Sequence, residues 1–349
     1  MQAIGVSHYG PPSNFEIRQV SLPSQPTGRD LLIQVKALSV NPIDTKIRAG
    51  KYDDAPDYYD HVPHPFHIIA PEAAGIVLSV GPDAQYFRPG DSVFYVSAPT
   101  RQGAAAEYQL VDERTIGHKP TSLDFVEAAV MPLTYGTAWE MAERLDIQEG
   151  EQAGILIING AGGVGSVATQ LARYVLRLPV VVATASRPET KEWVKQNGAT
   201  HVIDHREDLK TQIDNLGLDV PIKYIFILAS TEQYLSVASD ICAPLGKICS
   251  IVQSSVNFYG TQFLSKSLTF AWCWLGSRGY HDYDREAQHV MMENLAKYID
   301  EGKIHCTLTK RMKLTAEGLK TAHELIESKK TIGKIGLGVD EEGEREPFA

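Results

Sequence analysis

Three glycines with G-x-G-x-x-G spacing, Gly160, Gly162 and Gly165, are the part of this 349-residue chain best suited to binding phosphate groups. They follow the apolar run "GILII" and precede "GSVATQLARY", whose spacing is helical. In a strand–turn–helix unit, such a turn lets a pyrophosphate approach backbone N–H groups at the positive end of the helix. We therefore predict a dinucleotide site at Gly160, Gly162, Gly163, Val164 and Gly165; a tight turn without a ligand is the alternative.

The residues after the next predicted strand indicate which nucleotide is bound. An NAD site usually has an acidic residue there, which binds the ribose 2′-hydroxyl. The segment "VVVATASRPET" has Ser186 and Arg187 instead, a hydroxyl and a guanidinium that suit a 2′-phosphate. NADPH is therefore favoured over NADH. Ser186 and Glu189 can also form a capping box that begins the next helix, and the two roles are compatible.

The chain that must position these residues changes character at about Phe125. Before it, strand-like segments are separated by turn signals such as Gly81-Pro82 and Pro89-Gly90. After it, short apolar strands alternate with helices, which is the pattern of βαβ units and a parallel sheet. The predicted fold class is α/β, with a Rossmann nucleotide-binding domain and a second, β-rich domain.

The composition limits the class of partner. The net charge of -10 argues against a nucleic-acid or anionic-membrane surface, because both need basic patches. No apolar run is long enough to span a membrane, and the N-terminal segment lacks the features of a secretory signal. The 4 cysteines form no CxxC pair, so neither a disulfide framework nor a cysteine zinc site is indicated. We predict a cytoplasmic protein that acts on a small molecule.

Several segments also resemble one protein family in the order of their motifs. They are "LSVNPIDTKIRAG", "FRPGDSVF", "AAAEYQLV", "VDERTIGHKP", "AAVMPLTYGTAWEMA", "GAGGVGSVATQLA", "NGATHVIDH" and "GKIGLGV". Together they resemble the medium-chain dehydrogenase/reductase superfamily, in its zinc-free quinone oxidoreductase (zeta-crystallin-like) branch; "VDERTIGHKP" is similar to a subgroup often labelled zinc-type alcohol dehydrogenase-like. The resemblance implies a GroES-like catalytic domain beginning with residues 1–124, a Rossmann NADP(H)-binding domain of residues 125–275, and a return to the catalytic domain in residues 276–349.

The positions that hold zinc in the zinc-dependent branch of this family carry other residues here. The family's first cysteine ligand falls near Asn41, and Cys242 is the first cysteine of the chain. Pro71 stands at the histidine of the family's Gly-His-Glu segment, so that only Glu72 remains. The histidines of "HVPHPFH" are an alternative metal site, but the two prolines between them and their spacing prevent convergence: His61, His64 and His67. We expect no zinc.

Without a Lewis acid, an alcohol or an isolated ketone is a poor substrate. Hydride transfer is easier to a quinone, or to the activated C=C of an α,β-unsaturated carbonyl, because the enolate needs only hydrogen-bond donors and a proton source. We predict an NADPH-dependent oxidoreductase of this kind. The alternatives are a pathway-specific enoyl reductase of secondary metabolism and a cofactor-binding protein with little catalysis.

The catalytic candidates lie in "NPIDTK" and just beyond it. The resemblance implies that Asn41 and Asp44 lie beside the nicotinamide, with Asn41 donating to substrate or cofactor. Relatives often have a tyrosine where this chain has Lys46, which either stabilises an enolate or is solvated. Tyr52 and Tyr135 are further candidates for the proton donor, or are packing aromatics.

The remaining cofactor candidates come from the same resemblance. Thr134 and Thr137 are expected to face the cofactor, or else to bond their own helix backbone. Lys334 is expected to reach a cofactor phosphate, or else to be a surface lysine. His205 stands where relatives often carry a residue on the adenosine side.

The segment "SLTFAWCWL" carries Trp272 and Trp274 and resembles an edge strand that pairs across a dimer interface. An unpaired apolar edge is an aggregation hazard, so we predict a homodimer. The alternative is that the two tryptophans line a substrate pocket.

Overall fold

The structure is a computed structural model that describes residues 1–51 and 66–339 and divides into two compact units. Unit 1 combines Met1–Leu133, Gly276–Glu301 and Cys306–Ala349, and unit 2 combines Thr134–Leu275 and Gly302–His305. The first boundary follows Leu133, whereas the sequence analysis places it after Asp124. The short helix α2 (Phe125–Ala129) accounts for the difference, because it contacts strands of unit 1.

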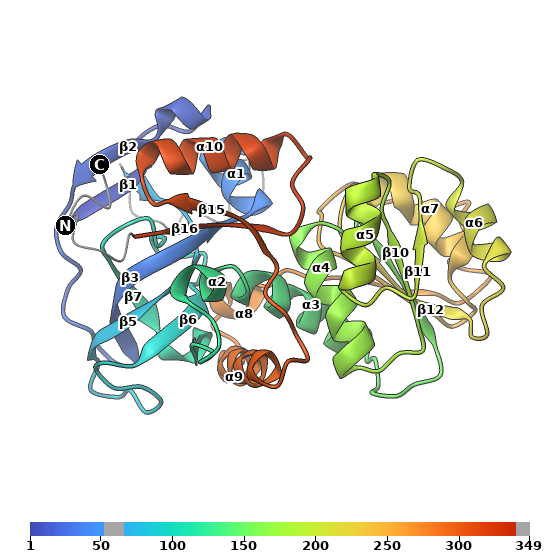
Figure 1. The fold of residues 1–349 in the computed structure, drawn as a ribbon, viewed down its shortest axis with the longest axis horizontal. Helices are drawn as coiled ribbons and strands as arrows, with labels where there is room; N and C mark the ends of the chain where they lie inside the picture. The colour runs from blue at the N-terminus through green and yellow to red at the C-terminus, as the bar shows by residue number, and fades with distance from the viewer. Residues whose placement is uncertain (52–65, 340–349) are drawn as a thin grey trace. The chain divides into compact units, whose positions relative to one another are not determined.

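Unit 2 contains a six-stranded sheet in the order β11-β10-β9-β12-β13-β14, and every neighbouring pair is parallel. Figure 1 labels three of these strands, β10, β11 and β12. Its strands are β9 (Gly154–Ile158), β10 (Val180–Thr184), β11 (His201–Ile203), β12 (Ile222–Ile227), β13 (Lys247–Ser250) and β14 (Thr269–Trp272). The order reverses between β9 and β12, which is the topological switch point of a Rossmann sheet, where a dinucleotide binds. The predicted α/β class and Rossmann sheet are confirmed.

The helices of unit 2 alternate with its strands, as the sequence predicts. They are α3 (Pro132–Arg144), which begins in unit 1, α4 (Gly163–Gln170), α5 (Pro188–Gln196), α6 (Leu209–Asn215) and α7 (Thr231–Ile241). All residues of β9 and β10 are buried, which is usual for parallel strands covered on both faces and explains their continuous apolar sequence.

Unit 1 contains a seven-stranded sheet in the order β15-β16-β3-β5-β6-β8, with β7 paired to β3, and a three-stranded sheet in the order β2-β1-β4. The strands are β1 (Gln2–Val6), β2 (Glu16–Gln19), β3 (Asp30–Val40), β4 (His67–Ile68), β5 (Glu72–Val80), β6 (Ser92–Val96), β7 (Tyr108–Asp112), β8 (Ile116–His118), β15 (Leu308–Lys313) and β16 (Lys334–Gly338). The longest of them, β3, pairs with three different strands. It therefore links the segment before residue 133 to the segment after residue 306.

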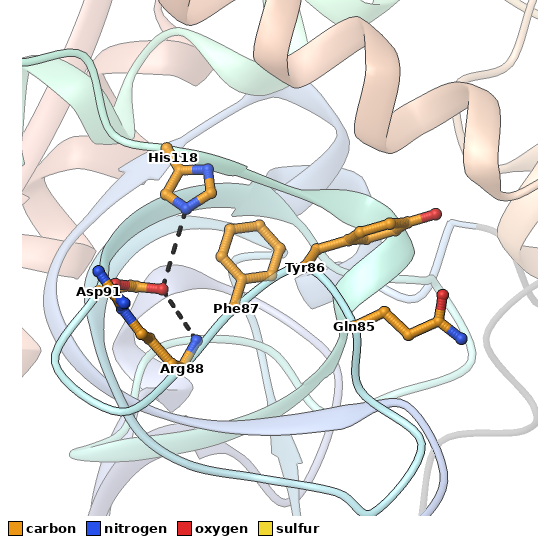
Figure 2. Close-up of a pocket in the computed structure, with 6 residues that line it drawn as sticks. All are labelled: Gln85, Tyr86, Phe87, Arg88, Asp91 and His118. Atoms are coloured by element: carbon orange, nitrogen blue, oxygen red, sulfur yellow. Dashed lines mark hydrogen bonds and ion pairs between the residues drawn. The ribbon is translucent and has the colours of Figure 1, made fainter.

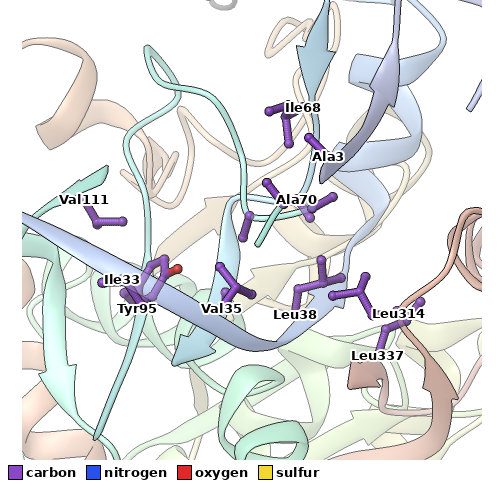
Figure 3. Close-up of a cluster of buried hydrophobic side chains, with 14 of the residues drawn as sticks. Ala3, Ile33, Val35, Leu38, Ile68, Ala70, Tyr95, Val111, Leu314 and Leu337 are labelled. Carbon is purple, nitrogen blue, oxygen red and sulfur yellow. The ribbon is translucent and has the colours of Figure 1, made fainter. Parts of the chain in front are cut away.

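The core of unit 1 is built on β3, from which Ile33, Val35 and Leu38 point into one apolar cluster (Figure 3). Leu314 and Leu337, from the C-terminal segment, complete this cluster. The helices of the unit are α1 (Pro42–Arg48), α2, α8 (Ser277–Tyr280), α9 (Glu286–Asp300) and α10 (Ala316–Glu327). Helix α10 contacts α1, β3 and β16, so the C-terminal segment also supports the helix that carries the catalytic candidates.

Among the residues that the structure describes, no helix combines the length and the apolar character that a membrane crossing requires.

Candidate active site and cofactor site

The strand register of unit 1 brings three polar residues to one end of β3. Val40 is opposite Ile335 in the antiparallel pair of β3 and β16, so Asn41 and Lys334 are neighbours across the ladder. Glu72 is the first residue of β5, which pairs with β3 on its other side. The cluster thus joins segments far apart in sequence, and we refer to Asn41, Glu72 and Lys334 as the buried triad.

The side chains of the buried triad bind one another. Asn41 Nδ2 donates to Glu72 Oε2 at 2.9 Å, and Lys334 Nζ donates to the same oxygen at 2.8 Å and also to Asn41 Oδ1. The other carboxylate oxygen, Glu72 Oε1, accepts the backbone N–H of Leu133 at 2.7 Å, in the first turn of α3. All three residues are buried: even Lys334, the most exposed of them, has only 3% of its surface accessible to solvent. A buried carboxylate and a buried ammonium are tolerable here because each neutralises the other.

Helix α1 begins at Pro42, and Asn41 is its N-cap. Asp44, at the third helical position, turns back towards this end of the helix, and its Oδ2 atom accepts the Asn41 backbone N–H at 2.7 Å. The Asn41 amide binds Glu72 and Lys334, with the Asp44 carboxyl group beside it.

The Asp44 carboxyl group is completely buried, and only one of its two oxygen atoms accepts a hydrogen bond. Its Oδ1 atom has no hydrogen-bond partner. Burial raises the pKa of Asp44 to about 7, against the lowering effects of the Asn41 backbone N–H and of the Lys334 charge. A carboxyl group that still holds its proton close to neutral pH is a suitable acid for a catalytic site.

The other catalytic candidates have different positions. Lys46 is half-buried in α1, and burial together with the charge of Lys51 lowers its pKa, so the fully solvated alternative does not describe it. Tyr135 lies in α3 and is fully buried. Tyr52 lies outside the described residues, so its role stays a prediction.

The residues at the family's zinc position do not suit a zinc ion. Zinc sites of this type need thiolate, imidazole or carboxylate ligands. The one carboxylate at this position, Glu72, is already occupied by an ammonium group and a backbone N–H, and Asn41 and Pro71 offer no anionic ligand. Within residues 1–51 and 66–339, no three histidine, cysteine or acidic side chains form a group able to hold a metal. Of the "HVPHPFH" histidines, only His67 is described, as a buried residue of β4.

The glycine turn of unit 2 has the geometry expected of a dinucleotide site. It connects β9 to α4, whose N-cap is Gly162. A Cβ atom on Gly165 would lie 2.3 Å from the Asn159 carbonyl oxygen, and one on Gly160 would lie 2.8 Å from Ala183 Cβ. Helix and strand therefore approach closely only because these positions lack side chains. The turn and the first turn of α4 are partly exposed, so their backbone N–H groups are accessible to a phosphate.

Two further cations lie near Ser186 and Arg187 at the end of β10. Arg206 Nη2 donates to the Ser186 carbonyl oxygen at 2.6 Å and pairs with Asp204 at 2.8 Å. Lys191 Nζ lies 3.2 Å from the same Asp204 carboxylate, whose pKa is lowered mainly by the hydrogen bond from Arg206. The sequence does not reveal Arg206, because its position beside Ser186 depends on β11 lying next to β10. Lys191 lies in α5, close to Ser186 in the sequence, and its pairing with Asp204 appears only in the structure.

The capping box predicted from Ser186 and Glu189 is wrong. Helix α5 begins with Pro188, and its N-cap is Arg187, whose backbone N–H donates to Thr190 Oγ1 at 3.0 Å. The reason is that proline is favoured at the first helical position, which fixes the N-cap one residue later than the sequence analysis places it. Ser186 therefore lies outside the helix.

The remaining predicted cofactor residues stay predictions. Thr134 and Thr137 are buried in α3 of unit 2. His205 follows β11 and is half-buried, and burial lowers its pKa. Lys334 is buried in unit 1, which excludes the surface-lysine alternative and leaves its contact with a cofactor phosphate untested.

A hollow of unit 1, of about 280 Å³, contains none of the predicted site residues (Figure 2). It is lined by Gln85, Tyr86, Phe87, Arg88, Asp91 and His118. His118 Nδ1 lies 2.9 Å from Glu293 Oε1 of α9, and this hydrogen bond raises the pKa of His118. The histidine thus ties β8 to α9, which is a structural role.

The chain matches two family models. Residues 27–121 match the alcohol dehydrogenase GroES-like domain, and residues 163–293 match the zinc-binding dehydrogenase family. A zinc-type alcohol dehydrogenase-like protein of Staphylococcus aureus (strain COL) is 37% identical over 333 residues, which cover 93% of this chain and 95% of that protein. This chain belongs to the medium-chain dehydrogenase/reductase superfamily. It is therefore an oxidoreductase with a GroES-like domain and a nicotinamide cofactor.

Other relatives carry different names within the same superfamily. A proposed zinc-dependent alcohol dehydrogenase of Rhizobium etli CFN 42 has a solved structure with a TM-score of 0.89, 39% identity, and coverage of 97% of this chain and 98% of that one. The human quinone oxidoreductase is 32% identical over 232 residues, which cover 64% of this chain and 66% of that protein. The resemblance stated from the motifs is confirmed.

Proposed function

We propose that this protein transfers hydride from NADPH to a quinone, or to the activated C=C of an α,β-unsaturated carbonyl, without zinc. The observation that carries the proposal is the buried triad. Lys334 supplies the positive charge that Glu72 needs, so the site offers amide, ammonium and carboxylic acid groups rather than a metal. The name of the human relative, quinone oxidoreductase, agrees with this class of acceptor.

NADPH is proposed over NADH because of the charges around Ser186. Three cations, Arg187, Lys191 and Arg206, lie at this end of β10, and two acids pair with them: Glu189 with Arg187, and Asp204 with the other two. A 2′-phosphate is dianionic and accepts several hydrogen bonds, so it gains more from these groups than a 2′-hydroxyl does. The turn from Gly160 to Gly165 would hold the pyrophosphate.

The cofactor, when bound, supplies the hydride; the residues of unit 1 manage the charge and the proton. The Asn41 amide has one N–H that is not engaged by Glu72, and this group donates to the oxygen on which negative charge develops. Asp44 holds its proton close to neutral pH and supplies it to the product. Lys46, with its lowered pKa, is the second candidate for this step.

The test is NADPH oxidation by metal-free protein, with a quinone and a 2-alkenone as alternative acceptors and NADH in parallel. Turnover that needs no added zinc and that prefers NADPH is expected. Saturable NADPH binding without turnover on either acceptor would favour a narrow-specificity enoyl reductase or a cofactor-binding protein instead.

We also propose that two copies of the chain pair through β14. This strand is at the edge of the parallel sheet of unit 2, and its Trp272 is 42% exposed beside Phe270. Phe258, which is also exposed and whose ring centroid lies 5.5 Å from that of Phe270, extends the apolar surface beside the same strand. An open edge of this kind is normally covered in a soluble protein.

A further inference from the structure

The Asn41 amide is hydrogen-bonded on both sides, by one group that can only donate and by one that only accepts. Lys334 is a lysine ammonium, which donates and never accepts, and it faces Oδ1. Glu72 is a carboxylate, which accepts, and it faces Nδ2. The two partners therefore define which end of the amide is oxygen and which is nitrogen, an assignment that is otherwise ambiguous for asparagine.

We propose that Lys334 is a positioning residue that orients and polarises the Asn41 amide, so that its second Nδ2–H donates to the substrate oxygen. This inference rests on the proposed function, because it assumes that Asn41 meets a developing oxyanion. It assigns Lys334 to the substrate side of the reaction and not to a cofactor phosphate.

The physical basis is the chain of hydrogen bonds through the amide. A cation that donates to the amide oxygen draws electron density from the nitrogen, and the N–H groups become stronger donors. The effect is large only where water does not screen the charge, and Lys334, Asn41 and Glu72 are all buried.

The first test separates the substrate role from the phosphate role. In Lys334→Met, kcat with saturating NADPH and 2-alkenone should fall by about tenfold or more, since losing a complete oxyanion donor costs about a hundredfold or more. The Kd of NADPH should stay within about twofold of the wild-type value, because no phosphate contact is lost. A matched control is Lys310→Met, which removes a positive charge from the exposed face of the neighbouring strand β15 and should change neither quantity.

The opposite pattern would overturn the proposal. If Lys334→Met weakened NADPH binding severalfold and left kcat at saturating NADPH unchanged, Lys334 would be a cofactor residue.

The second test separates positioning from simple neutralisation of Glu72. Lys334→Met leaves the Glu72 carboxylate buried and unpaired, which destabilises the variant. The double variant Lys334→Met with Glu72→Gln removes both charges. The new glutamine amide can donate to Asn41 Oδ1, which reverses the Asn41 amide. We expect the melting temperature to recover while kcat stays low. Recovery of both would show that Lys334 only balances a charge.

A third measurement does not depend on turnover. Protein labelled with ¹⁵N-asparagine has a pair of side-chain amide signals from Asn41, which Asn41→Asp identifies by their loss. The polarised amide should resonate downfield in the wild type and move upfield in Lys334→Met. An unchanged signal would refute the polarisation by Lys334 even if the protein is active. A shifted signal without turnover on any acceptor would leave the positioning intact and count against the proposed reaction.

Discussion

Replacing Asp44 with asparagine should remove a pH dependence from the stability of unit 1. The Asp44 carboxyl group is completely buried, accepts one hydrogen bond from the Asn41 backbone, and has no partner at Oδ1. Its pKa is raised from 3.8 to about 7, mainly by burial. An asparagine can still accept the bond from the Asn41 N–H through its own oxygen, so the N-cap of α1 is retained.

The sign and the size of the effect follow from the raised pKa. Below pH 3.8 the carboxyl group is protonated in the folded and unfolded chains, and its ionisation costs nothing. As the pH rises towards about 7, the unfolded chain ionises while the folded one does not, so stability is lost. The full loss of stability is up to about 4 kcal/mol, and more than half of it accrues between about pH 5 and pH 8. Asp44→Asn does not titrate and avoids this loss.

The assay must report on unit 1 alone. Tryptophan fluorescence cannot do so, because the four tryptophans lie in unit 2: Trp139, Trp193, Trp272 and Trp274. Hydrogen exchange read by mass spectrometry on peptides from β3 and β5 gives local stabilities, and comparing two proteins at one pH cancels the intrinsic exchange rate. The stability of Asp44→Asn relative to wild type should rise steadily from pH 5 to pH 8, and peptides from β9 should show no such trend.

A matched control is Asp300→Asn in α9. The pKa of Asp300 is lowered to about 2, and the carboxylate accepts bonds from Thr121 and Ser122. The stability that this carboxylate contributes is fully present above the pKa of an unfolded aspartate, so Asp300→Asn should lose the same stability at pH 5 and at pH 8. If the stability difference between Asp44→Asn and wild type were also the same at pH 5 and pH 8, the argument that burial raises the pKa of Asp44 would be refuted.

Four shorter predictions concern the cofactor site, the fold and the surface. Arg206→Ala should raise the KM of NADPH by about tenfold and leave that of NADH unchanged, and equal effects on both would argue against a 2′-phosphate contact. Gly165→Ala should destabilise unit 2 by about 1–3 kcal/mol in urea unfolding followed by tryptophan fluorescence, because its Cβ would meet the backbone of Asn159 and Gly160 in the turn. Glu293→Gln should lower the pKa of His118 in an NMR titration; in the wild type the pair stabilises the fold at low pH, and this contribution is lost as the pH rises through the raised histidine pKa. Trp272→Lys should shift the protein from dimer to monomer in sedimentation, and a wild-type monomer at all concentrations would reject the proposed pairing.

The sequence predicts unit 2 well because its evidence is local. Short apolar strands alternate with helices, and the glycine turn identifies the first βα unit, so the parallel sheet follows. The error at α5 is also local in origin: Pro188 at the first helical position outweighs the Ser186–Glu189 pattern. The charge that Arg206 adds next to Ser186 cannot be found in the same way, because it depends on the pairing of β10 with β11.

The site in unit 1 shows that candidate residues alone do not define a site; the register of the paired strands is needed to show which of them are in contact. Asn41, Glu72 and Lys334 each draw attention in the sequence, but nothing there indicates that they touch, and Asn41 and Lys334 are 293 positions apart. A single alignment of strands, Val40 opposite Ile335, makes them neighbours. Once they are neighbours, elementary chemistry decides the rest: the ammonium donates, the carboxylate accepts, and the amide between them has one defined orientation. The proposal that Lys334 orients Asn41, in place of binding a cofactor phosphate, is therefore available only from the pairing of β16 with β3.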